Sequence, residues 1–137
     1  MLVMEQLPSI RKWAECRLDC NFGDQAITIA NYQDGKVVAV VVLSNFKKTQ
    51  CELSIASDSP KWGSRLFIRE VFNFAFNYAK LHRVNSLISV SNDKSISLCE
   101  RLGFIREGKL REAADDGSDL WVYGMLKSEC RWVNYGR

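Results

Sequence analysis

The segment from Gly63 to Lys80 constrains the fold most strongly, because its apolar residues recur at helical spacing between two strand-like segments. These residues follow one another at three- and four-residue steps, which place them on one face of an amphipathic helix: Leu66, Phe67, Val71, Phe74, Ala75 and Tyr78. A helix that crosses between two strands of one sheet delivers those strands parallel. The flanking segments Cys51–Ser57 and Val84–Val90 are therefore predicted to be parallel neighbours.

The remaining segments predict an α/β fold around this crossover. Alternation and β-branched residues indicate strands over Ala26–Tyr32 and Lys36–Ser44, joined by an Asp34-Gly35 turn. In the strand after the crossover, Leu87, Ile88 and Val90 are available for burial. The other expected elements are a helix from a Ser9 N-cap to about Cys20, a helix over Lys94–Leu102 ended by Gly103, and strands over Phe104–Arg111 and Leu120–Leu126 with a turn at 115–118. The result is a mixed, mostly antiparallel sheet with flanking helices and a central parallel strand pair.

The length and the lack of a repeat or an obvious linker favour one globular domain over residues 1–137. The net charge is only +3, and Lys and Arg are scattered among Asp and Glu, which argues against a nucleic-acid partner. The most apolar stretch, Val37–Leu43, is far too short to span a bilayer, so no membrane partner is expected.

Cysteine usage indicates free thiols and no metal site. The cysteines form no CxxC pair, and the chain contains 1 histidine, His82. Their positions are Cys16, Cys20, Cys51, Cys99 and Cys130. Such a pattern is typical of a reducing cytoplasm, and we expect a cytoplasmic protein without a bound metal.

The segment Asn92–Phe104 carries a family resemblance. It reads Asn-Asp-Lys-Ser, followed by a helix that ends in Glu-Arg-Leu-Gly-Phe, and it is similar to a run found in the GNAT superfamily of N-acetyltransferases. The continuation Ile105–Arg111 resembles the ribosomal-protein N-terminal acetyltransferase branch. The tail Asp119–Trp132 resembles a GNAT subgroup met in phages and prophages. The resemblance extends over residues 51–132 and implies the GNAT fold, with acetyl-CoA as co-substrate.

The resemblance places a pyrophosphate-binding loop at residues 60–65. In the family this loop reads Gln/Arg-x-x-Gly-x-Gly/Ala, and this chain keeps only the central Gly63. Pro60 offers no N–H, whereas Arg65, which replaces a small residue, could contact a phosphate directly. Trp62, Gly63, Ser64 and Arg65 are therefore candidate cofactor-binding residues. The alternative is an ordinary helix start that Ser64 caps.

The same resemblance implies a binding site for the pantetheine arm. The strand Cys51–Ser57 would splay from its neighbour and offer backbone groups near Ile55 and Ser57 to the pantetheine amides. Asn92 and Ser95 would lie beside that arm. The alternative role of Asn92 is to cap the following helix.

Two residues are candidates for the acid–base chemistry. Glu52 matches a position where relatives carry a glutamate base, although a surface or salt-bridging role is the alternative. Cys99 stands where the family usually presents a tyrosine acid to the departing thiolate. A thiol could supply that proton, but a buried cysteine usually packs as a small hydrophobe. Tyr123 and Tyr78 are alternative hydroxyls.

The resemblance thus implies an acetyl-CoA-dependent N-acetyltransferase that acts on a primary amine, carried by a small molecule or by a protein. Two alternatives stay open. One is a GNAT-fold protein that binds acyl-CoA with little or no turnover, and the other is a phage-type accessory protein. A homodimer is compatible with the predicted enzyme and with both alternatives.

Overall fold

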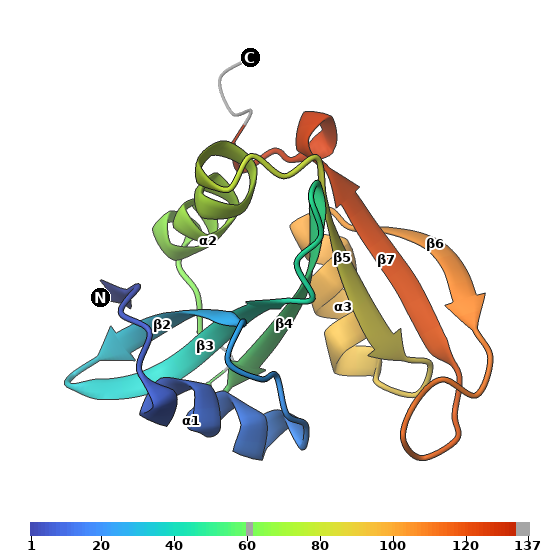
Figure 1. Cartoon of the computed structure of the whole chain (residues 1–137), viewed down its shortest axis with the longest axis horizontal. Coiled ribbons are helices and arrows are strands. Elements are labelled where there is room, and N and C mark those ends of the chain that lie inside the picture. The colour runs from blue at the N-terminus through green and yellow to red at the C-terminus, as the bar shows by residue number, and fades with distance from the viewer. Residues whose placement is uncertain (60–61, 134–137) are drawn as a thin grey trace.

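A seven-stranded sheet organises the chain, for which the computed structural model describes residues 1–59 and 62–133. The spatial order of the strands is β1-β2-β3-β4-β5-β7-β6. Their bounds are β1 Leu2–Val3, β2 Ile27–Gln33, β3 Lys36–Ser44, β4 Gln50–Ser57, β5 Arg83–Ser89, β6 Ile105–Leu110 and β7 Leu120–Leu126. All neighbours pair antiparallel except β4 and β5, which are parallel. The mixed, mostly antiparallel sheet with its parallel pair is thus confirmed (Figure 1).

The hairpin between β2 and β3 follows directly from its sequence. Asp34 and Gly35 have φ angles of 52° and 77°, the left-handed region that Asp and Gly tolerate in tight turns. The expected strand Lys36–Ser44 matches β3, and the strand before the turn is displaced by only one residue. The short edge strand β1 was not anticipated, because two residues display no periodicity.

The helices differ from expectation mainly at their ends. Helix α1 spans Pro8–Leu18, and its N-cap is Leu7 rather than Ser9. Ser9 was wrongly assigned as the cap because Pro8 itself occupies the first helical position, where its missing N–H costs nothing. Helix α3 spans Asp93–Leu102 and ends at Gly103, whose φ of 111° confirms it as the left-handed terminator.

The crossover helix is shorter than its periodicity predicts. Helix α2 spans Arg65–Asn73, and the chain continues as the π-helical segment η1 over Phe74–Tyr78. Within η1, Ala75 and Phe76 are buried, whereas Tyr78, which the spacing placed on the apolar face, is 76% exposed. Leu66 is also 67% exposed, so the apolar face is narrower than the spacing suggested.

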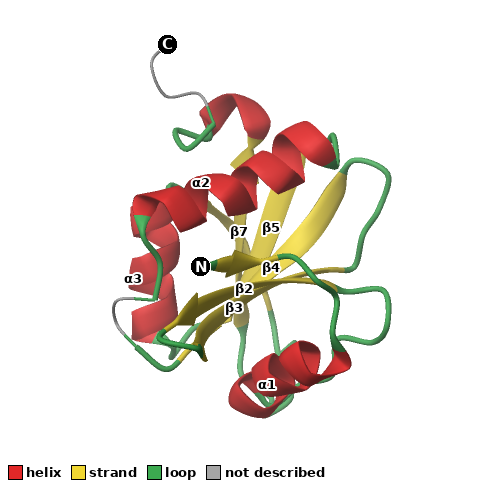
Figure 2. Cartoon of the chain, turned by 90° about the vertical axis from the view of Figure 1, so that its left-hand side faces the viewer, coloured by secondary structure: helices red, strands yellow, loops and turns green. Residues whose placement is uncertain are grey.

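Two clusters of buried side chains lie on opposite faces of the sheet. Helix α1 covers one face of β2–β4, where Ile10 and Ala14 pack with Ala30, Val40 and Val42. Helices α2 and α3 lie on the other face, as Figure 2 shows, over the larger core. On the α1 side, the β5-β7-β6 half of the sheet has no helix in the described part of the chain (Figure 1). Leu87 lies there and is 39% exposed, so its expected burial was wrong.

No helix formed by residues 1–59 or 62–133 has both the length and the apolar character that crossing a membrane requires.

Candidate active-site cleft

The parallel strands β4 and β5 separate soon after they meet. Their pairing comprises Gln50↔Arg83, Cys51↔Val84 and Glu52↔Asn85, and it ends there although β4 continues to Ser57. The next link across the gap comes from a side chain, because Ser86 Oγ donates to the Leu53 carbonyl at 3.1 Å. The sheet therefore opens from Leu53 onward.

The separation exposes the backbone of β4 on its β5 side. The Leu53 carbonyl points toward β5, as its bond to Ser86 shows. Backbone groups alternate in direction along a strand, so those of Ile55 and Ser57 point the same way. Beyond Glu52 they have no ladder partner on β5. An extended ligand with amide groups can pair with such an edge.

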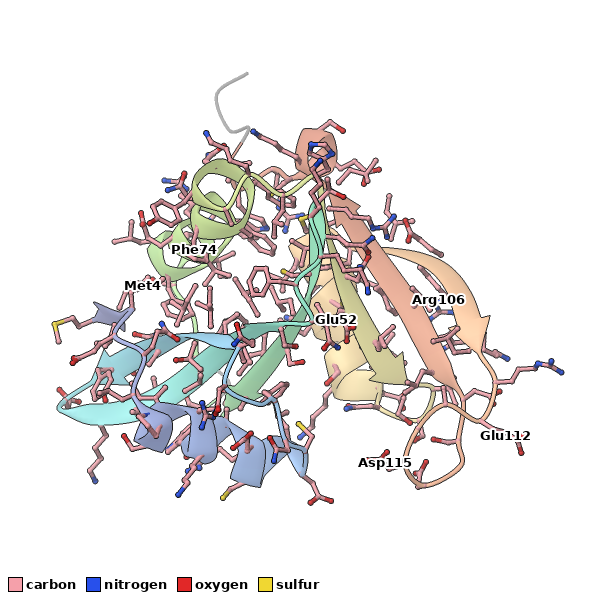
Figure 3. All side chains as sticks on the ribbon, viewed as in Figure 1. Met4, Glu52, Phe74, Arg106, Glu112 and Asp115 are labelled. Atoms are coloured by element: carbon pink, nitrogen blue, oxygen red, sulfur yellow. The ribbon has the colours of Figure 1, made fainter. Side chains whose placement is uncertain are left out.

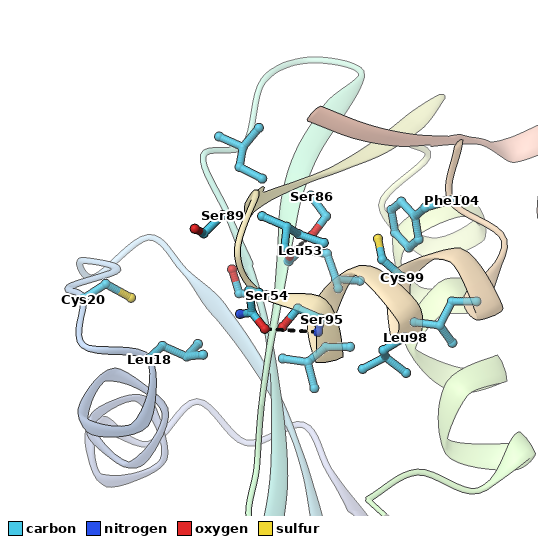
Figure 4. Close-up of a pocket in the computed structure, with 15 residues that line it drawn as sticks. Leu18, Cys20, Leu53, Ser54, Ser86, Ser89, Ser95, Leu98, Cys99 and Phe104 are labelled. Atoms are coloured by element: carbon cyan, nitrogen blue, oxygen red, sulfur yellow. Dashed lines mark hydrogen bonds between the residues drawn. The ribbon is translucent and has the colours of Figure 1, made fainter. Parts of the chain in front are cut away.

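A cavity of about 270 Å³ lies at this opening, between β4, β5 and α3. Figure 4 shows Ser54 of β4 and Ser86 of β5 on one side and Ser95 and Cys99 of α3 on the other, with Cys20 at the far edge. Asn92 also lines it, and Asn92 Oδ1 accepts from Ser95 N at 3.2 Å. Asn92 is therefore the α3 N-cap, as its alternative role predicted, and it also faces the cavity.

A second, wider cavity of about 830 Å³ continues from the first along α3. The two cavities share Ile55, Ser95 and Leu98. Two basic side chains of α3, Lys94 and Arg101, line the wider one. Both were missed by the sequence analysis, although their seven-residue spacing places them on one helix face. Asp58 and Asp93 also line it. The guanidinium group of Arg17 donates two hydrogen bonds to the Asp58 carboxylate, each of 2.8 Å.

Of the predicted phosphate-loop residues 62–65, one lines the wider cavity. Trp62 and Ser57 line it, whereas Gly63, Ser64 and Arg65 are outside its lining. Ser64 Oγ accepts from Phe67 N at 3.1 Å and so caps α2, as the alternative interpretation proposed. Gly63 has no left-handed φ, and a Cβ there would lie 3.5 Å from Phe67 and Ile68, an ordinary contact. Arg65 is exposed, and Pro60 lies outside the described residues.

Glu52 lies at the point where β4 and β5 part (Figure 3). Its side chain is on the α1 side of the sheet, on the same face as Ser54, which lines the narrow cavity. Residues two apart on a strand are about 7 Å apart. Glu52 is partly exposed, and its Oε2 accepts from Asn45 Nδ2 at 2.8 Å. A carboxylate in this place can accept a proton from a group that enters from the α1 side.

Cys99 lines the narrow cavity but is only 5% exposed. Burial raises the pKa of its thiol to about 12, and a hydrogen bond with Ser86 opposes that shift. An ordinary thiol ionises near ~8.5, so a proton transfer from Cys99 to a free thiolate would be uphill by roughly 3 to 4 pKa units. The geometry therefore favours packing, and an acid role for Cys99 stays a prediction.

Neither alternative tyrosine lines the cavities. Tyr123 is fully buried, where its hydroxyl donates to Glu100 Oε2 at 2.8 Å and accepts from Arg106 Nε at 3.0 Å. Tyr78 stacks on Phe74 at the exposed end of the crossover, with ring centroids 5.2 Å apart. Serine hydroxyls line the narrow cavity instead, and among them Ser86 is 8% exposed. No sequence motif marked Ser86, because its place depends on where β4 and β5 part.

Removing the Cys99 thiol tests whether Cys99 packs as a buried side chain or acts as the acid. Cys99→Ala should cost about 1–2 kcal/mol of unfolding free energy, because it removes a small buried group. Turnover of the folded enzyme and its profile between pH 6 and 10 should stay unchanged, because a thiol with a pKa of about 12 does not ionise in that range. Steady-state rates over that range decide the matter. A fall in turnover with an altered alkaline limb would instead assign the acid role to Cys99.

Solved structures share this fold over most or all of the chain. Spermidine N-acetyltransferase from Vibrio cholerae superposes with a TM-score of 0.77 at 16% identity, covering 100% of this chain and 98% of that one. A provisionally assigned acetyltransferase from T. thermophilus superposes with a TM-score of 0.67 at 26% identity, covering 84% of this chain and 64% of that one. This protein has the GNAT fold.

Sequence comparison gives a shorter match to the same kind of protein. YdaF of Bacillus subtilis (strain 168), provisionally named a ribosomal N-acetyltransferase, is 38% identical over 64 residues. The match spans 44% of this GNAT-fold chain and 35% of that relative. No protein-family model matches the chain.

Proposed function

We propose that this chain is an N-acetyltransferase that moves the acetyl group of acetyl-CoA to a primary amine. The observation that carries the proposal is the early end of β4–β5 pairing at Glu52, with a cavity lined by both strands and α3 beyond it. At the opening, backbone groups of β4 are not paired with β5 and could bind an extended thioester ligand. Glu52 lies where the two strands part. The structural neighbours that share the fold are acetyltransferases.

The residues of the cleft fit acetyl-CoA. The backbone groups of Ile55 and Ser57 would pair with the pantetheine amides, with Asn92 and Ser95 on the α3 side. The wider cavity would take the phosphates, near Lys94, Arg101 and Trp62. The positive end of the α3 dipole also favours negative charge there.

Transfer then requires one proton to leave the amine. Glu52 would accept that proton, directly or through a water, as the amine nitrogen attacks the thioester carbonyl carbon. The new C–N bond forms as the C–S bond breaks, and the sulfur leaves as a thiolate. A thiolate is a tolerable leaving group without a dedicated acid. Solvent at the open end of the cleft can protonate it after it leaves.

The acceptor is an amine carried by a small molecule or by a protein. Both kinds occur among similar proteins, since the Vibrio cholerae enzyme is a spermidine N-acetyltransferase and YdaF is provisionally named a ribosomal N-acetyltransferase. The five free thiols accord with a cytoplasmic setting.

Binding and turnover can be tested separately. Isothermal titration with acetyl-CoA should give a saturable heat, and mass spectrometry should detect acetylated product from a panel of polyamines, lysine peptides and free-N-terminal peptides. Titration without heat would remove the cleft as an acetyl-CoA site. Mass detection is preferable to a thiol assay, because the protein itself carries free cysteines.

A second candidate is a GNAT-fold protein that binds acyl-CoA without turnover. The observation that favours it is the buried Cys99 where the family presents a tyrosine, with a thiol pKa of about 12. Saturable acetyl-CoA binding with no acetylated product across the panel would support this candidate over the enzyme.

Charge reversal on α3 tests the proposed phosphate site. Lys94→Glu combined with Arg101→Glu should weaken acetyl-CoA binding about tenfold at low salt, because two attractive charges become repulsive. The effect should shrink at high salt, since these side chains are solvent-accessible. Titration at two ionic strengths measures both. Lys36→Glu, at the remote β2–β3 hairpin, is the matched control. An affinity equal to that of the control would place the phosphates elsewhere.

A further inference from the structure

The proposed base is held by one side chain from the loop after β3. Ser44 lies opposite Glu52 in the β3–β4 register, and Asn45 follows it. Asn45 Nδ2 donates to Glu52 Oε2 at 2.8 Å. Among the described residues, Glu52 Oε1 accepts no hydrogen bond, so one oxygen is held and the other is left for a proton.

Asn45 is itself fixed by the loop. Its φ of 50° lies in the left-handed region, which Asn and Gly tolerate better than other residues. A hydrogen bond of 2.8 Å from Lys47 N to Gln50 O closes the loop just behind it. The amide of Asn45 is therefore presented from a constrained backbone rather than from a flexible arm.

The neighbour on the other side of Glu52 is already engaged. Asn85 of β5 lies opposite Glu52. Its Nδ2 donates to Gln50 Oε1 at 2.7 Å, and its Oδ1 accepts from Arg83 Nε at 2.7 Å. Within the described residues, Asn45 alone therefore orients the Glu52 carboxylate.

We infer that Asn45 is a positioning residue for acetyl transfer: it fixes the rotation of the Glu52 carboxylate so that Oε1 faces the incoming amine. The inference rests on the proposed function and on Glu52 as its base. Asn45 touches neither substrate in this arrangement, and its entire effect passes through Glu52.

The test is a double-mutant cycle between the two residues. Asn45→Gly removes the amide while keeping the left-handed backbone unstrained, and it should lower kcat about tenfold, within the range for a hydrogen bond to a charged group. The KM for acetyl-CoA should not change. In a Glu52→Gln background the same substitution should have no further effect on kcat. Asn45→Asp, which tolerates the same φ but faces Glu52 with a like charge, should lower kcat further.

The control is Asp34→Gly, which removes another left-handed side chain at a remote turn and should leave kcat unchanged. Unchanged kcat in Asn45→Gly, or an equal loss with and without Glu52, would overturn the positioning role. A full rate in Glu52→Gln would instead remove Glu52 as the base. A wild-type protein that acetylates no amine of the panel would overturn the proposed function and this inference with it.

Discussion

Glu52→Gln should lower kcat by ~10²–10⁴-fold, the usual range for the loss of a general base, while the dissociation constant of acetyl-CoA stays unchanged. The amide has the shape of the carboxylate and can still bond to Asn45, but it cannot accept a proton from the amine near neutral pH. Glu52 also lies on the α1 side of the sheet, away from the wider cavity that would hold the phosphates. Binding and chemistry should therefore separate in this variant.

Two measurements check that result, steady-state turnover on the best amine of the panel and titration with acetyl-CoA. Gln50→Glu is a useful companion, because it adds a carboxylate two residues away on the same face of β4. It should not restore turnover to Glu52→Gln, since Gln50 lies before the strands part. Full turnover of Glu52→Gln would mean that water or the substrate itself carries the proton, and acetyl transfer would stand without this base.

Phe72→Ala should destabilise the protein by about 3–5 kcal/mol, the range for deleting a large buried aromatic side chain. Phe72 is 1% exposed and fastens α2 to the sheet. Its ring packs against Phe76 and Phe104, with centroids 6.2 Å and 6.1 Å away. Such a loss is a large share of a typical folding free energy of roughly 5–15 kcal/mol. We expect the unfolding temperature to fall by roughly 10–20 °C.

Urea unfolding followed by circular dichroism measures this loss. Phe72→Leu, which keeps much of the buried volume, should cost less than half as much. The matched control is Tyr78→Ala on the adjacent η1 segment, where the side chain is 76% exposed and its removal should change stability by about 0.5 kcal/mol or less. A loss below about 1 kcal/mol for Phe72→Ala would mean that α2 is held mainly by other contacts.

The order of the elements could be predicted from the sequence because each depends on neighbours along the chain. The Asp34-Gly35 turn fixes the hairpin, Gly103 stops α3, and the crossover through α2 makes β4 and β5 parallel. The ends of the helices were less predictable, because adjacent residues changed where α1 begins and where α2 ends. Helix α1 begins at Pro8 with Leu7 as its N-cap, and the chain continues after Asn73 as a π-helical segment in which Tyr78 is exposed.

Local sequence thus determined the fold class, the parallel pair and the positions of Glu52, Ile55 and Asn92 on their elements, because periodicity and turn chemistry act over a few residues. Only the tertiary structure decided which side chains meet. The β4–β5 pairing ends at Glu52, Ser86 bridges to Leu53, and Asn45 reaches Glu52, all through contacts between strands. The burial of Cys99, which raises its thiol pKa, also depends on residues far away in the chain. A single sequence carries no direct record of such contacts, because the free energy of each depends on how separate elements pack.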